Sequence, residues 1–334
     1  MMNTNSFRLA AMAAAVSVAL VACGNSSEDE APTQQDPTSA VFSLGVSDAP
    51  VTEAAEVVIC FSGIELVGNG MPPQRFTLGS DDFTAETNDV CRDEAGNVVP
   101  NSRGIDLLTL QGANAEALIT GATVSAGSYG QLRLDIADGS YVELLDGSRQ
   151  PVRVPSNQLR LDGPTLSAGG TFSYTLEFDL RRALVNPVGQ PGFIVQPRGL
   201  RLVDNSEVGH LEGLVSEGFL LDNQCDVNPA DERAAVAAVY LFEGADVALD
   251  GMSDNRSDDN ASDELQLPYA STGVFFVNDA TEYRYSIGFI AAGNYTVAIT
   301  CDLEDDPEEV DEILFLAAQN ISIEAQQQPH QLDF

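Results

Sequence analysis

Residues 172–180 read FSYTLEFDL, and this stretch decides the fold class. Its even-numbered positions are apolar, while the odd-numbered positions from Ser173 to Asp179 are polar. Strict alternation over this length predicts a β-strand with one face on a core and the other toward solvent. The polar face carries Glu177 and Asp179. Paired carboxylates can serve a glycosidase, but the alternation itself explains both side chains as solvent-facing, and we expect them there.

The same signal recurs on both sides of this strand. Further strands are predicted at 41–46, 57–66, 131–136, 141–145, 151–154, 193–203, 208–215, 234–242, 273–277, 283–290, 294–300 and 313–323. We expect turns at 47–50, 146–147 and 167–170, a tight hairpin turn at 292–294 and one short helix at 112–119. The chain is therefore predicted to be all-β, with two β-sandwich domains in tandem at residues 40–204 and 207–334.

Several segments of the first predicted domain carry a family resemblance. They are VFSLGVSDAPVTEAAEVVICFSGIEL (41–66), IDLLTLQGANAEALITGATVSAGSYGQLRLDI (105–136), FSYTLEFDLRRALV (172–185) and GFIVQPRGLRLV (192–203). Taken in order, these segments resemble the domain of unknown function catalogued as family 4382, which occurs in secreted proteins and lipoproteins of bacteria and archaea. The resemblance covers about residues 40–204. It implies no activity, because the family has none assigned.

The second predicted domain carries a weaker resemblance. The phrases HLEGLVSEG (210–218) and YSIGFIAAGNYTVAITC (285–301) are similar to transthyretin-like or carboxypeptidase-regulatory-like β-sandwich modules. The similarity covers about residues 207–334. Modules of this kind are mostly structural or binding units, so the resemblance favours a non-catalytic role for this half.

The N-terminus resembles a bacterial lipoprotein signal. Arg8 precedes an apolar run that ends in the lipobox LVAC at 20–23, which predicts a signal peptide at 1–22 and a lipidated, palmitate-bearing Cys23. The alternative is an ordinary secretory signal with a chance cysteine. Gly24 follows in place of the aspartate of the inner-membrane retention signal, which favours the outer membrane of the cell envelope. Residues 23–39 are polar and predict a flexible tether.

Charge excludes one class of partner. The chain has 51 acidic residues against 15 Lys and Arg, and its net charge is −36. Such a surface repels phosphate backbones, so we expect no nucleic-acid partner. All the basic residues counted are arginines. Without a lysine the chain can form no Walker A loop, no Schiff base and no Ser-Lys dyad.

Cysteine usage agrees with an oxidising compartment. Besides Cys23, the chain contains Cys60, Cys91, Cys225 and Cys301. Four cysteines allow three pairings, and the one that respects the proposed domain division is Cys60 with Cys91 and Cys225 with Cys301. The alternative use is a metal or redox site, but no C-x-x-C motif is present and no histidine lies near a cysteine in sequence.

Three acidic loops, at 222–232, 250–264 and 302–312, decorate the second predicted domain. The middle loop could supply several oxygen ligands for a calcium ion, from Asp250, Asp254, Asp258, Asp259, Asp263 and Glu264. No EF-hand spacing is present, since Arg256 occupies a ligand position. The alternative is that the loops are solvated insertions. We expect no cofactor other than this calcium ion.

Catalytic signatures are few. The chain has two histidines, His210 on a predicted strand and His330, and it contains no G-x-S-x-G or H-E-x-x-H motif. The sequence therefore predicts a non-enzymatic lipoprotein that acts as a structural or interaction module toward an envelope protein or polysaccharide. The alternatives are a calcium-assisted glycan-binding or adhesion module and an unrecognised hydrolase, and a convergent acidic cleft would favour the last.

Overall fold

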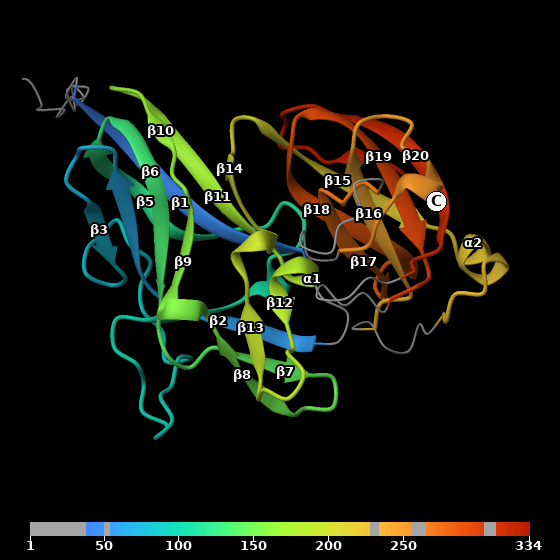
Figure 1. Ribbon diagram of the computed structural model, residues 1–334, viewed down its shortest axis with the longest axis horizontal. Helices are drawn as coiled ribbons and strands as arrows, with labels where there is room; N and C mark the ends of the chain where they lie inside the picture. The colour runs from blue at the N-terminus through green and yellow to red at the C-terminus, as the bar shows by residue number, and fades with distance from the viewer. Residues whose placement is uncertain (1–37, 50–53, 228–233, 256–264, 304–311) are drawn as a thin grey trace, which may run out of the picture. The chain divides into compact units, whose positions relative to one another are not determined.

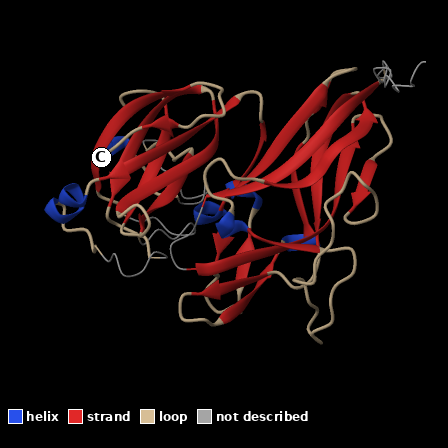
Figure 2. Ribbon diagram, turned by 180° about the vertical axis from the view of Figure 1, so that it is seen from behind, coloured by secondary structure: helices blue, strands red, loops and turns tan. Residues whose placement is uncertain are grey.

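Strands form nearly all of the regular structure in the computed structural model (Figure 2), which confirms the predicted all-β class. The structure describes residues 38–49, 54–227, 234–255, 265–303 and 312–334. Residues 35–334 belong to one structural unit. The predicted signal peptide, Cys23 and the tether as far as residue 37 lie outside the described residues.

The alternating stretch forms β11, a central strand of a four-stranded sheet. In spatial order this sheet consists of β14 (Leu200–Asp204), β11 (Thr171–Asp179), β1 (Ser39–Ala49) and β5 (Glu116–Ser125). Figure 1 shows these strands side by side. β1 runs parallel to β11, and the other pairs are antiparallel. Phe42, Leu176 and Phe178 are fully buried on the inner face, as the alternation predicts.

A larger sheet is built around β2 (Ala54–Gly68). Its first half pairs with β7 (Tyr141–Leu144) and β4 (Arg103–Asp106), and its second half with β6 (Gly127–Ile136) and β3 (Gln74–Thr77). Neighbours on both sides explain the continuous burial from Val57 to Phe61. The sheet is completed by β8 (Arg149–Arg153), β9 (Gln158–Asp162), β10 (Thr165–Leu166), β12 (Leu184–Val185) and β13 (Phe193–Val195).

The inner faces of these two sheets share one apolar core. Its members come from both sheets, and the rings of Phe61 on β2 and Phe178 on β11 meet edge to face with centroids 6.2 Å apart. Short helical turns connect the strands. They are η1 (Leu107–Thr109), η2 (Pro155–Asn157), α1 (Leu180–Ala183) and η3 (Pro197–Gly199).

The remaining strands form a separate seven-stranded sheet. Its spatial order is β20 (Phe315–Ile323), β19 (Gly293–Thr300), β16 (Ala237–Glu243), β17 (Ala270–Val277), β18 (Glu282–Ala291), β15 (Val208–Val215) and β21 (His330–Gln331). Helix α2 (Glu217–Asp222) follows β15, and η4 (Leu249–Gly251) follows β16. Among the described residues, this sheet shares no strand with the sheets that end at Asp204. The division into two domains stays a prediction.

The predicted helix at 112–119 is wrong, because this stretch leads into β5. Leu118, Ile119 and Ala122 are spaced as on a helix face, but Thr120, Thr123 and Val124 are β-branched and favour a strand. Pairing with β1 decides the outcome, and residues 111–114 form only a turn, in which Asn114 N donates to Gln111 O at 3.3 Å.

Three predicted turns or strands also differ from the structure. β1 continues through 47–49, where a turn was expected, because Ser47 and Asp48 pair with Glu177 and Phe178. The strand predicted at 193–203 is divided by η3 at Pro197, which has no N–H to donate to a ladder. The expected hairpin at 292–294 does not form, because β18 and β19 are separated in the sheet by β16 and β17.

Both predicted disulfides are confirmed. Cys60 on β2 is bonded to Cys91, with their Cα atoms 5.8 Å apart, and Cys225 is bonded to Cys301, with their Cα atoms 5.2 Å apart. Cys60 and Cys91 are completely buried in a small cluster with Val58. This bond ties the long irregular segment before β4 to the centre of the larger sheet.

Candidate functional site

The calcium ligands predicted from the sequence are only partly described by the structure. Asp258, Asp259, Asp263 and Glu264 lie outside the described residues. Asp250 is exposed at η4, whereas Asp254 is 2% exposed and accepts a hydrogen bond from Ser253 Oγ at 2.9 Å. Within the ranges that the structure describes, no group of three or more His, Cys, Asp or Glu side chains is arranged to hold a metal ion.

The carboxylates of Glu177 and Asp179 are buried, so the prediction that they face solvent is wrong. Glu177 is 0% exposed and Asp179 is 2% exposed. Both lie on the outer face of the four-stranded sheet. Glu177 is in register with Ser47 of β1 and Arg201 of β14, and Asp179 is in register with Ala49 of β1. A polar sheet face of this kind becomes buried only when another part of the chain covers it, and the hydrogen bonds identify the covering segments.

Two segments cover this face. Ser47 Oγ lies 2.7 Å from Asn114 O and 3.0 Å from Leu110 O, and its one hydroxyl hydrogen holds the turn at 110–114 over β1. On the other side, Arg201 Nη1 donates to Tyr269 O at 2.5 Å, and the guanidinium lies 4.4 Å from the centre of the Tyr269 ring. Tyr269 immediately precedes β17, so part of the cover comes from the seven-stranded sheet.

Burial sets the protonation of the two acids. Desolvation raises the pKa of Glu177 to about 8, and the nearby positive charge of Arg201 only partly opposes the shift. Desolvation also raises the pKa of Asp179, although the positive charges of Arg182, Arg201 and Arg181 oppose this shift. At neutral pH Glu177 is therefore mainly a neutral acid enclosed beside a cation.

Arginines connect this face to the seven-stranded sheet. Arg181 Nη2 donates to the buried hydroxyl of Tyr240 at 2.9 Å, and Arg182 Nη1 donates to Pro268 O at 3.3 Å. Together with Arg201, they place guanidinium groups from α1 and β14 against β16 and the start of β17. Hydrogen bonds to charged donors in such enclosed surroundings are stronger than exposed ones, so these contacts hold the two parts of the chain together.

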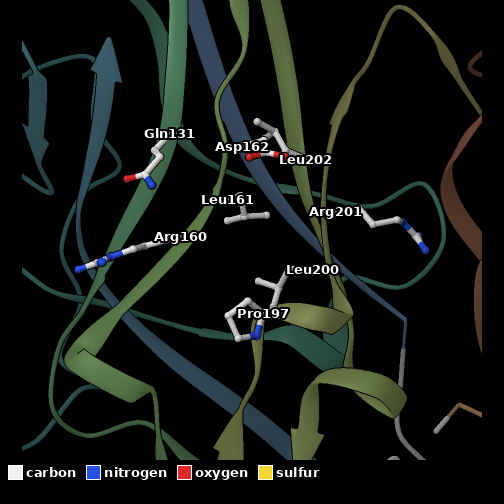
Figure 3. A pocket seen from close by; sticks show the side chains of 8 residues that line it. All are labelled: Gln131, Arg160, Leu161, Asp162, Pro197, Leu200, Arg201 and Leu202. Carbon is white, nitrogen blue, oxygen red and sulfur yellow. The ribbon is translucent and has the colours of Figure 1, made fainter. Parts of the chain in front are cut away.

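An open groove lies beside this buried face, between β9 and β14 (Figure 3). Its volume is about 480 Å³. Leu161, Leu200 and Pro197 provide apolar surface, and Gln131 and Arg160 lie on the β6–β9 side, as Figure 3 shows. Arg201 points away from the others in the same view, which agrees with its contact to Tyr269.

Both strands that border the groove are edge strands of their sheets. Among the described strands, β9 pairs only with β6, and β14 pairs only with β11. An edge strand presents backbone N–H and C=O groups along its unpaired side. The groove therefore combines apolar and polar side chains with two sources of backbone hydrogen bonds, an arrangement suited to an extended chain.

The sequence offered a signal for β9 that the prediction missed. The pentapeptide QLRLD occurs at 131–135 and again at 158–162, and the two copies pair antiparallel with Arg133 opposite Arg160. Each arginine bonds to the glutamine two residues before it: Arg133 Nη2 donates to Gln131 Oε1 at 2.7 Å, and Arg160 Nε donates to Gln158 Oε1 at 2.8 Å. The repeated pentapeptide is thus a sequence signal for both β6 and β9, the two strands on one side of the groove.

Both histidines of the chain contact backbone groups. Nδ1 of His210, which is 2% exposed, accepts a hydrogen bond from Phe289 N at 3.2 Å, and Nε2 of His330 lies 3.0 Å from Glu324 N and 3.2 Å from Glu324 O. Desolvation lowers the pKa of His210. A neutral imidazole that already accepts a backbone N–H has lost the nitrogen that a general base would use.

Comparison with known proteins places one family on the first half of the chain. Residues 39–197 match the family model described as "Domain of unknown function (DUF4382)". This match supports the family resemblance inferred from the sequence motifs. No curated protein matches the chain.

Two of the solved structures that match the chain do so at low similarity. A leucine-rich repeat protein from Bacteroides thetaiotaomicron is 12% identical, with a TM-score of 0.19, over 89% of this chain and 26% of its own. A candidate cell adhesion protein from Bacteroides fragilis is 16% identical, with a TM-score of 0.15, over 48% of this chain and 44% of its own. The chain therefore spans less than half the length of either protein, and similarity at this level carries no argument about fold or function.

Proposed function

We propose that this protein is a lipid-anchored protein of the bacterial cell envelope, held in the outer membrane through Cys23, and that it acts by binding rather than by catalysis. The lipobox at 20–23 supports the anchor, and the polar residues after it supply a spacer that ends where β1 begins. The described residues contain no helix long and apolar enough to span a membrane. The buried His210, whose Nδ1 accepts a hydrogen bond from Phe289 N, supports a non-catalytic role.

The observation that carries the binding role is the groove between β9 and β14. An extended segment of a partner protein would add its backbone to the edge of β9 or β14 and place alternate apolar side chains on Leu161, Leu200 and Leu202. Arg160 at the rim would then meet an acidic or amide side chain of the partner. Binding of a partner segment to a strand edge in this way needs no catalytic group.

The anchor is tested by Cys23→Ser in a bacterial host with a lipoprotein pathway. The wild-type protein is expected to incorporate labelled palmitate and to sediment with the outer membrane, because the lipid supplies the membrane affinity. The variant is expected to lose the label and to appear in the soluble fraction. Its thermal unfolding should match that of the wild type, which excludes misfolding as the cause. Palmitate incorporation by the variant, or membrane association without label, would overturn the anchor.

The groove is tested with a photo-crosslinking amino acid introduced at Leu161 in living cells. We expect a discrete crosslinked species at this position, because a partner's extended segment would lie directly over it. The matched control is the same amino acid at Val188, which is 98% exposed and lies away from the groove lining. Equal crosslinking at both positions would indicate random collisions, and no product at Leu161 would reject the groove as the binding surface.

A further inference from the structure

A second groove, of about 520 Å³, lies at one end of the seven-stranded sheet. It is formed where β15 ends, where α2 begins and where the connection between β17 and β18 returns, with the segment at 333–334 along one side. Backbone hydrogen bonds fix this side: Phe334 N donates to Leu214 O at 2.9 Å, and Ser216 N donates to Phe334 O at 2.8 Å. The groove is therefore part of the folded framework.

Aromatic rings line this groove. Phe276 and Tyr283 meet with ring centroids 5.1 Å apart and planes inclined by 55°, and Phe334 lines the same groove. Tyr283 is only 4% exposed, and its hydroxyl forms no hydrogen bond to a described residue. A buried hydroxyl without a partner costs free energy, so natural proteins usually keep one only where something else satisfies it.

The polar rim of the groove is acidic. Glu217, Glu282 and Asp333 line it, and no Arg or His is among its lining residues. Two of these acids already accept hydrogen bonds. Glu282 Oε2 accepts one from Arg284 Nη2 at 2.6 Å, and Asp333 Oδ1 accepts one from Leu214 N at 2.8 Å. Glu217 lies close enough to Tyr283 that its charge adds to the desolvation that raises the pKa of the phenol. The carboxylate of Glu217, the third acid of the rim, thus lies beside the unpaired hydroxyl of Tyr283.

We propose that this groove binds an organic cation of the size of an arginine or lysine side chain. The N–H groups of the cation would donate to the Tyr283 hydroxyl and to the Glu217 carboxylate, and its aliphatic part would lie on Phe276 and Phe334. Aromatic faces and carboxylates both attract a cation, and neither attracts an anion. This site is separate from the groove between β9 and β14.

The test is calorimetric titration of the full chain with n-butylguanidinium, with n-butylamine as a second cation and methyl glucoside as the sugar. We expect saturable binding of the guanidinium. Tyr283→Phe and Glu217→Gln should each weaken it about tenfold, the effect of losing one hydrogen bond to a charged group. The matched control is Glu324→Gln, which removes an exposed carboxylate of the same module outside the groove and should change affinity less than twofold.

The variants also separate a specific site from general attraction to an acidic protein. Tyr283→Phe keeps the ring and the net charge, so its loss of affinity cannot come from either. Unfolding midpoints within experimental error of the wild type show that each variant is folded. Three results would overturn the proposal: no saturation by about 50 mM guanidinium, which corresponds to negligible affinity, equal weakening by Glu324→Gln, or tighter binding of the glucoside than of either cation.

Discussion

Replacing Cys60 and Cys91 together by alanine is expected to lower the free energy of unfolding by about 4 kcal/mol, because the disulfide limits the conformations of the unfolded chain. The two cysteines are 31 residues apart in sequence. The enclosed segment contains the second half of β2 and the short strand β3, and most of the rest has no regular structure. The measurement is denaturant unfolding followed by circular dichroism, in which the midpoint should fall and the slope should rise as the unfolded state expands.

Reduction opens both disulfides, so the control for packing is reduction of a protein in which Cys225 and Cys301 are already replaced by alanine, where only the bond between Cys60 and Cys91 can be reduced. Cys60 and Cys91 are completely buried beside Val58, so the variant with alanine at these two positions also loses some apolar contact. Reduction opens the covalent loop but leaves the side chains in place. The two treatments should agree in direction, with the alanine variant losing more. If the reduced protein unfolds at the midpoint of the oxidised protein, the bond between Cys60 and Cys91 does not stabilise this fold.

Much of this fold could be predicted because the buried patterns are local. β11 begins and ends within one residue of the alternating stretch at 172–180. What alternation cannot show is the environment of the polar face. Glu177 has the same local sequence whether that face meets water or another segment, and the turn at 110–114 that covers the sheet beside it comes from far upstream in the chain. Burial of a polar face by distant residues leaves no periodic signal.

Turn residues likewise predicted where the chain changes direction, but not which strands pair with each other. The predicted hairpin at 292–294 has a glycine and an asparagine, which allow the chain to change direction. The chain does turn there, but β18 pairs with β15 and β17, whereas β19 pairs with β16 and β20. The groove between β9 and β14 escaped prediction for the same reason, since its two sides come together only through the pairing of other strands.

Stability is expected to fall as pH rises from about 5 to 7.5, in a way that depends on Glu177. Burial raises the pKa of this carboxyl from 4.5 to about 8. Between these values the folded protein keeps a proton that the unfolded chain has released. The free energy of unfolding therefore decreases by about 1.4 kcal/mol for each pH unit attributable to this group. The contribution is fully present below pH 4.5 and is lost as pH rises through 8.

The difference between wild type and Glu177→Gln isolates this contribution, because a net charge of −36 also makes the whole protein sensitive to pH. Glutamine resembles the protonated acid and cannot ionise, so the variant should gain stability relative to wild type steadily from pH 5 to 7.5, at constant ionic strength. Glu324→Gln removes the same charge at an exposed position and serves as the control. A constant difference between wild type and Glu177→Gln across this range would mean that the carboxyl is already ionised in the folded protein. Arg201, which contacts Tyr269, would then form an ion pair with the ionised Glu177 instead of lying beside a neutral acid.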